Sequence, residues 1–309
     1  MNEIFSATVI IGVLSSGIRL ATPYLYAAIG ETFGQRSGVL NLGVEGQMLL
    51  GAFASFYVAL TTGSLVYGLL IAMLVGALMG LAMAYVTVNL HAEQGISGIG
   101  FYLFGLGMSE LLFKMLLGTV ETVKGFSVVP IPFLSQIPVL GEIFFQQNIL
   151  VYIAFLLVPV AWFVLNKTTL GLKIRSVGEN PEAADSLGVS VARIRYFTII
   201  LGGTLSGLAG ASMSIALLNV FQQNIARGLG FIAVALVYFG AWRPWGVLAG
   251  ALLFSMVNSL QLWMQVLNVP IPSDIAVMLP YLLTIIVLVA TVSRVRSPAA
   301  LTKPFDRGD

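Results

Sequence analysis

The chain contains no cysteine and a single histidine, His91. Without cysteine there can be no disulfide, no thiolate nucleophile and no cysteine ligand for a metal ion. One histidine supplies neither a metal-ligand cluster nor a histidine-based catalytic triad. The sequence also lacks the G-x-x-x-x-G-K-[ST] phosphate loop of nucleotide-binding chains. These absences argue against an enzyme and predict no catalytic residue, metal site or cofactor on this chain.

Charge is scarce as well. Charged residues make up 9% of the 309 residues, whereas 58% are hydrophobic and the mean hydropathy is +0.96. Soluble domains carry about 25% charged residues. Because a soluble core could not enclose this much apolar surface, the composition predicts a polytopic membrane protein. The net charge of +2 is too small to indicate a nucleic-acid partner.

Apolar runs follow one another along the chain, and a bilayer core of about 30 Å needs about 20 helical residues to cross it. The predicted spans are 4–28, two within 46–90, 96–117, 149–165, 196–220, two within 228–267, and 275–292. The first segment has an acid at Glu3 and no basic stretch before it, so we expect a span and not a cleavable signal peptide. The expected fold is all-α: one transmembrane domain over 1–309, a bundle of about 8–10 spans with broken helices.

Two local patterns refine these spans. Residues 196–220 carry small residues four apart, which let membrane helices approach closely. They are Gly202, Ser206 and Gly210, with Gly203 and Gly207 in a second register. The run from 228 to 267 is interrupted by Trp242 to Trp245, and we interpret it as two spans that turn at this tryptophan pair.

The longest polar segment, residues 166–195, lies between two apolar flanks and is rich in Lys and Arg. Such an excess is typical of cytoplasmic loops. With this loop in the cytoplasm, the number of following spans places the basic tail, 294–309, there too. The same count makes the proline-rich loop 119–148 external and puts the N-terminus outside.

A short helix is predicted inside the polar segment. Asn180 can cap it, Pro181 suits its first position and Gly188 stops it. Two turns cannot span a bilayer. Such a helix lies along the membrane face and can fit a groove on a soluble partner, with Ala183 and Ala184 as the close-packing surface.

The sequence of residues 168–189, TTLGLKIRSVGENPEAADSLGV, resembles the cytoplasmic coupling loop of permease subunits of binding-protein-dependent ABC importers. The likeness is to the branched-chain amino acid, ribose and nucleoside group of permeases. Within that group it is strongest to the nucleoside or simple-sugar permeases that work with lipoproteins of the basic membrane protein family. An ordinary loop between two spans is the alternative. The resemblance implies coupling to an ATPase through Gly178, Glu179, Asn180, Pro181, Glu182, Ala183, Ala184, Asp185 and Gly188.

A second block, GQRSGVLNLGVEGQMLLGAF at residues 34–53, resembles the hallmark that follows the first span in these permeases, with Gln35 where an acid is more usual. Residues 228–254 are also similar to the family. We expect a polar break at 31–38, and a helix interrupted by Gly38, Gly43 and Gly46. Broken helices at membrane depth line a cavity or pack within protein.

Asn41, Glu45 and Gln47 in this block are candidates for the translocation path or its gate. The alternative for Glu45 is a structural carboxylate that is hydrogen-bonded to nearby backbone. A second group of amides, Asn258, Gln261 and Gln265, shares one helical face by its spacing. A path rich in amides suits a neutral, hydroxylated solute, although bonds between helices would also explain these residues.

The resemblance implies a permease subunit of an ATP-driven importer in the bacterial cytoplasmic (inner) membrane, with a nucleoside as the solute and a simple sugar as the alternative. It also implies partners: an ATP-binding subunit that holds ATP and Mg²⁺, a second permease that is a distinct paralogue, and an extracytoplasmic substrate-binding lipoprotein. A stand-alone, ion-coupled secondary transporter is the other class of function. It would need intramembrane carboxylates, for which Glu45 and Glu110 are the candidates.

Overall fold

A computed structural model describes residues 7–267, 278–279, 282–283, 285–286, 289 and 296–306. Apart from those single helical positions, the span predicted at 275–292 lies outside the described residues. The same holds for both ends of the predicted tail. Within the described residues, seven helices are long and apolar enough to cross a membrane. They are α1 (Ala7–Arg36), α2 (Val44–Thr62), α3 (Leu65–Ala84), α4 (Gln94–Leu116), α6 (Ile149–Lys167), α9 (Val191–Ser212) and α11 (Pro244–Val266).

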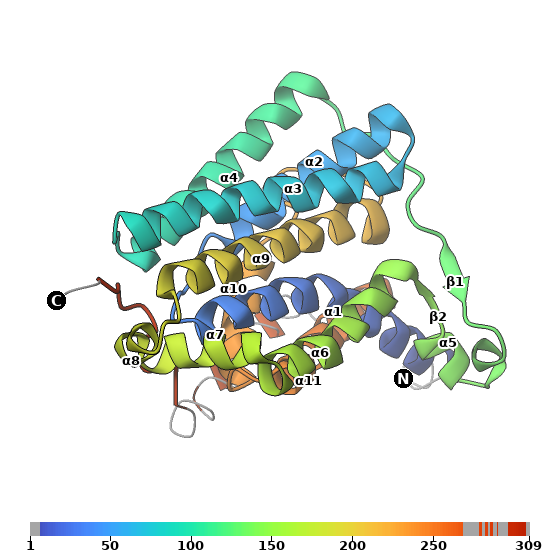
Figure 1. Cartoon of the computed structure of the whole chain (residues 1–309). Helices are drawn as coiled ribbons and strands as arrows, with labels where there is room; N and C mark the ends of the chain where they lie inside the picture. Colours follow the sequence, from blue (N-terminus) through green and yellow to red (C-terminus); the bar gives the residue numbers. More distant parts are fainter. Residues whose placement is uncertain are drawn as a thin grey trace.

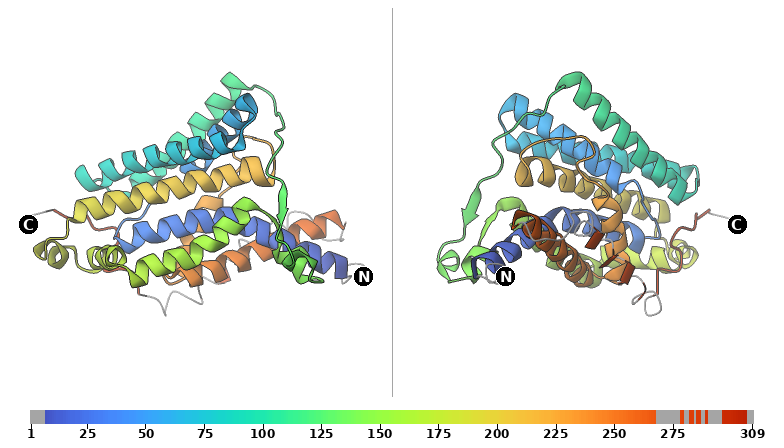
Figure 2. Two further views of the ribbon diagram at one scale, coloured as in Figure 1. Left: turned by 45° about the vertical axis from the view of Figure 1, so that its right-hand side comes forward. Right: turned by 180° about the vertical axis from the view of Figure 1, so that it is seen from behind.

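The predicted all-α bundle is confirmed. Short π-helical turns, η1 (Tyr85–Asn89) and η3 (Met213–Leu217), continue α3 and α9. In the described part of the chain, β structure is limited to an antiparallel pair, β1 (Val128–Pro130) and β2 (Gln146–Asn148), and one isolated bridge. Helix α9 lies in the middle, with α2, α3 and α4 on one side and α1, α6 and α11 on the other (Figures 1 and 2).

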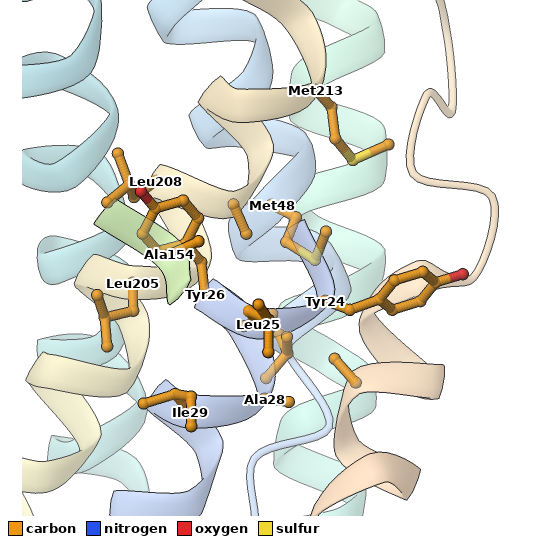
Figure 3. Packing of buried hydrophobic residues seen from close by; sticks show 14 of the residues in the cluster. Tyr24, Leu25, Tyr26, Ala28, Ile29, Met48, Ala154, Leu205, Leu208 and Met213 are labelled. Carbon is orange, nitrogen blue, oxygen red and sulfur yellow. The ribbon is translucent and has the colours of Figure 1, made fainter. Parts of the chain in front are cut away.

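Glycine allows α9 to occupy this central place. A Cβ atom on Gly203 would collide with the carbonyl oxygen of Gly76 on α3, and one on Gly210 would collide with that of Met48 on α2. A Cβ on Gly51 of α2 would lie 2.6 Å from the Cα of Gly207. The close approach predicted from the small residues of 196–220 is therefore confirmed. Side chains from α1, α2, α6 and α9 fill the remaining core, as Figure 3 shows around Leu25.

We expect Gly203→Ala to lower the melting temperature of the detergent-purified protein by several degrees. Overpacking a tight contact costs about 1–3 kcal/mol, and the atom that blocks the new methyl group is backbone, which cannot rotate away. Gly107→Ala on α4 is the matched control, because no described atom lies within 4 Å of its added Cβ. Melting temperatures are measured by fluorescence-detected size-exclusion chromatography. Equal melting temperatures for the two variants would contradict the tight α3–α9 contact.

Helix α1 is longer than predicted. The polar break expected at 31–38 is wrong in its first part, because the helix continues to Arg36 and only 37–43 leave it. Glu31 and Gln35 are buried and lie one turn apart, with Gln35 Nε2 donating to Glu31 Oε1 at 3.0 Å. Since their polar groups are satisfied inside the bundle, no solvent-exposed turn is needed there.

The break that does occur spans residues 37–43, with Gly38 in the left-handed region at φ +92°. Gly46 does not interrupt a helix, contrary to the prediction, because it lies within α2. It is instead a contact point with α4: a Cβ on Gly46 would lie 2.8 Å from the Cα of Tyr102.

The bundle has two distinct ends (Figure 1). One end carries the N-terminus of α1, the β1–β2 pair and the short helix α5 (Leu140–Phe144). The other carries α7 (Thr169–Glu179) and α8 (Pro181–Ser186). Residues 37–43 and 300–306 also lie at this second end, because Ala300 N donates to Gly178 O at 2.9 Å and Thr302 N donates to Gly38 O at 3.1 Å.

Candidate functional site

A half-length helix lies among the spans. α10 (Leu229–Phe239) has 11 residues, which at 1.5 Å per residue is about 16 Å, or roughly half of a bilayer core. The first of the two spans predicted within 228–267 is therefore wrong: α10 is too short to cross a bilayer, and an irregular segment, 218–228, precedes it. α10 packs against α1, α11 and α2.

Glu45 holds the start of α10. Gly228 N donates to Glu45 Oε1 at 2.7 Å, and Gly230 N donates to Glu45 Oε2. The first N–H groups of a helix have no partner within the helix, so a carboxylate at that point satisfies them and complements the helix dipole. Glu45 is buried in the first turn of α2, and a Cβ on Gly230 would lie 2.6 Å from its Cα. This geometry favours the structural alternative for Glu45.

The far end of α10 joins a second polar cluster. Trp242 Nε1 donates to Gln35 Oε1 at 2.8 Å, and Arg36 Nε donates to the Trp242 carbonyl at 2.9 Å. Glu31 Oε1 accepts from Asn41 N at 3.0 Å as well as from Gln35. The last turn of α1, the 37–43 break and the end of α10 are thus bonded into one unit.

We expect Trp242→Phe to lower the melting temperature by an amount that corresponds to about 1 kcal/mol, because one buried hydrogen bond is lost while the ring packing is kept. Trp245→Phe is the matched control, because Trp245 is half exposed on the next helix. Thermal unfolding of both variants in detergent measures the difference. A Trp245→Phe effect as large as that of Trp242→Phe would contradict the role of the Trp242–Gln35 bond.

Asn41 and Gln47, which flank Glu45 in the sequence, bond to each other. Asn41 Nδ2 donates to Gln47 Oε1 at 3.3 Å, and Asn41 Oδ1 accepts from Gly43 N at 2.9 Å. All three predicted residues are buried. Gln47 Nε2 finds no hydrogen-bond partner among the described residues. Their place in a translocation path or gate stays a prediction.

The amides of α11 do not join this cluster. α11 packs against α1, α10 and α6, whereas α2 packs mainly against α3, α9 and α4. Gln261 is buried, Asn258 is half-buried and Gln265 is exposed. The two groups of path candidates therefore do not form one site.

The short helix predicted inside the polar segment is present as α8. Asn180 caps it, its Oδ1 accepting from Ala183 N at 3.0 Å, and Pro181 is its first residue. Gly188, at φ +83°, ends it. The preceding helix, α7, was missed: it follows α6 after Thr168 alone, whose Oγ1 accepts from Gly171 N at 3.1 Å.

The predicted coupling residues on α7 and α8 differ in how deeply they are buried. Gly178 is buried, and a Cβ there would collide with the Arg36 carbonyl. Ala184 is buried against Val177 and Val191, so only Ala183 of the predicted alanine surface is available to a partner. The others are exposed (Glu179, Asn180, Glu182, Ala183 and Gly188) or half-buried (Pro181 and Asp185).

An exposed leucine next to these residues was missed. Leu187 is 84% exposed directly after α8. Because it adjoins the exposed residues of α8, it is a further candidate for contact with a partner. The signal in the sequence was a leucine between Ser186 and the helix-stopping Gly188.

Residues 13–288 match the family described as branched-chain amino acid transport system / permease component. The chain belongs to this permease family. It is 37% identical to the guanosine ABC transporter permease protein NupQ of Bacillus subtilis, over 93% of this chain and 94% of NupQ. It is 38% identical to TsgC13 of Haloferax volcanii, over 96% of this chain and 98% of TsgC13, a protein named provisionally as a glucose ABC transporter permease. NupP, also a guanosine ABC transporter permease protein of B. subtilis, is 27% identical over 89% of this chain and 78% of NupP. No solved structure matches the chain.

The permease ties its α7–α8 pair to the bundle through its last described residues. Phe305 packs against the Val177, Ala184 and Val191 cluster. The Oδ2 atom of Asp306 lies 3.9 Å from the Nδ1 atom of His91, which is in the turn before α4. There Glu93 caps α4, and the N–H groups of Ile96 and Gly95 lower the pKa of its carboxyl group. The α7–α8 pair and residues 300–306 are thereby in contact with the end of α1, the 37–43 break and the turn before α4.

Proposed function

We propose that this permease is the membrane-spanning subunit of an ATP-driven importer that carries a nucleoside inward, with ATP and Mg²⁺ bound on a separate subunit. The observation that carries the proposal is α8. It is a capped, two-turn helix whose outer face is exposed and whose inner face is packed on α7 and α9. A helix of this kind can seat in a groove of a soluble ATPase and pass its movement to the spans.

The end that carries α8 faces the cytoplasm in this proposal. Most Lys and Arg residues in the described loops and helix ends lie there, as the positive-inside rule requires. They are Arg36, Lys167, Lys173, Arg175, Arg193, Arg195, Arg243 and Lys303. Loop 117–148, which carries Lys124 alone, is then external and available to an extracytoplasmic lipoprotein that delivers the solute.

The second permease in the complex is a distinct paralogue. B. subtilis has two guanosine permeases that both resemble this chain, NupQ more strongly than NupP. This pattern fits a heterodimer in which the present chain takes the place of NupQ. The names of NupQ and NupP favour a nucleoside, and the name of TsgC13 keeps a simple sugar as the alternative solute.

Affinity purification of the tagged chain from its own cells, followed by uptake assays in proteoliposomes, tests the proposal. We expect an ATP-binding subunit and a second permease to co-purify. Uptake of tritiated guanosine should require ATP and the lipoprotein receptor. Uptake of radiolabelled glucose in place of guanosine would select the sugar alternative. Ion-driven uptake by the chain alone would contradict the importer and favour a secondary transporter.

A further inference from the structure

The irregular segment 218–228 runs from one end of the bundle to its middle. Its start lies at the β1–β2 end, where Val220 pairs with Thr122 and Asn219 O accepts from Val123 N at 3.0 Å. Its last residue, Gly228, donates a hydrogen bond to Glu45, and the length of α10 separates Gly228 from the opposite end of the bundle. That length is about 16 Å, so Gly228 lies near the middle of a core of about 30 Å. Figure 2 shows the same course from behind.

Polar side chains leave this segment at mid-depth. Phe221, Ile225 and Ala226 are buried, and the ring of Phe221 meets Phe53 edge-on with centroids 5.3 Å apart. Gln223, Asn224 and Arg227 are exposed. The apolar residues thus fix the segment to α2, and the polar residues between them point out of the protein core.

The backbone is held in an unusual conformation where these side chains emerge. Asn224 and Arg227 have positive φ values of +51° and +47°, which non-glycine residues seldom adopt. Such positions persist only where the surrounding structure enforces them, and they cluster at functional sites. Here the enforcing contacts are the buried apolar residues and the Glu45 bonds to Gly228 and Gly230.

Lipid cannot cover these side chains. A guanidinium at the bilayer centre is energetically costly, and irregular backbone at that depth occurs only where it is buried in protein or lines water. No ion pair joins Arg227 to an acidic residue in the described part of the chain. The N–H groups at the start of α10 are occupied by Glu45, so an anion would find no free helix terminus there.

We propose that Gln223, Asn224 and Arg227 line the solute pathway in the middle of the membrane and hydrogen-bond the hydroxyl and carbonyl groups of a neutral, ring-containing solute. The inference rests on the proposed importer function and assigns its binding wall. Amide and guanidinium groups supply donors and acceptors for such groups. In the next turn the ring of Phe231, 37% exposed, meets Tyr102 edge-on with centroids 5.1 Å apart, and offers an apolar face to a base or sugar ring.

Because the chain contains no cysteine, single-cysteine variants test the wall in the complete complex. We expect a membrane-impermeant methanethiosulfonate reagent to label Asn224→Cys and Arg227→Cys, and saturating guanosine to slow the labelling several-fold. Leu74→Cys, exposed halfway along α3, is the matched control and should stay unlabelled. Asn224→Ala and Arg227→Ala should lower guanosine uptake about tenfold or more, and Arg227→Lys should recover part of it.

Wild-type uptake, measured in the same vesicles, tests the importer function separately. If the wild type transports guanosine while the cysteines at 224 and 227 react no faster than the Leu74→Cys control, the wall is wrong and the importer stands. Labelling that guanosine does not slow, together with unchanged uptake by both alanine variants, overturns the wall as well. Absence of ATP-dependent uptake by the wild type overturns the importer itself.

Discussion

Replacing Glu45 with alanine is expected to abolish uptake and to reduce sharply the amount of folded protein recovered in detergent. The carboxylate accepts hydrogen bonds from Gly228 N and Gly230 N, and it is buried. Hydrogen bonds to a charged group are worth about 1.5–3 kcal/mol each, and removal of this acceptor leaves two N–H groups in the bundle without a partner. Few membrane proteins would tolerate the loss of both bonds.

Glu45→Gln separates the anchoring role from general loss of folding. The amide oxygen can accept one of the two bonds, but the amide NH₂ group would face the other N–H. We therefore expect a melting temperature between those of the wild type and Glu45→Ala, and reduced uptake. Glu110→Gln on α4 is the matched control, because Glu110 is a half-buried carboxylate on a helix that packs mainly on α2 and α3 rather than on α10.

The two explanations for Glu45 predict different results. If Glu45 anchors α10, uptake falls in step with melting temperature across Glu45→Gln and Glu45→Ala. A Glu45→Gln variant that melts like the wild type but loses uptake would contradict the anchor and would support a direct part in the path or gate. Uptake rates measured at a temperature where all variants are folded separate these cases.

Replacing Ala183 with arginine, or Leu187 with aspartate, is expected to uncouple the permease from its ATPase while the bundle stays folded. Both side chains are exposed on α8 or directly after it, so neither change disturbs internal packing. Loss of a central interface contact costs about 2–4 kcal/mol. Since about 1.4 kcal/mol is a factor of ten, ATP-dependent uptake should fall by roughly 30-fold or more.

Two further variants sharpen this test. Ala184→Arg changes the neighbouring alanine, which is buried, so it should lower the melting temperature as well as uptake. Leu140→Asp changes a half-exposed leucine at the opposite end of the bundle and should leave co-purification of the ATP-binding subunit unchanged. Normal receptor-stimulated ATPase activity in Ala183→Arg and Leu187→Asp would remove α8 from the coupling interface.

Features with local causes could be predicted from the sequence. The cap at Asn180, the proline after it and the stop at Gly188 act within a few residues, and α8 begins and ends where they indicate. Long apolar runs likewise predicted that the seven long helices exist, although not all of their ends, because hydrophobicity alone drives a segment of about 20 residues into a bilayer. The glycines of 196–220 predicted close packing, although not the helices they would meet.

Tertiary structure alone decided the features that depend on distant partners. α1 continues to Arg36 because Gln35 meets Trp242, 207 positions away. α10 begins at mid-depth because Glu45, 183 residues before Gly228, binds its first turn. Ala184 is buried because Phe305 and Val191 cover it.

The physical reason for the difference is the same in each case. Apolar length, caps and stops act on the chain's own neighbouring backbone, so their effect is written in consecutive residues. Whether a polar side chain in a membrane protein is paired, buried or open to water depends on which helices surround it. For this permease, the sequence by itself determined the membrane bundle and the short helix α8, and the tertiary structure decided where a helix breaks and which polar groups stay exposed.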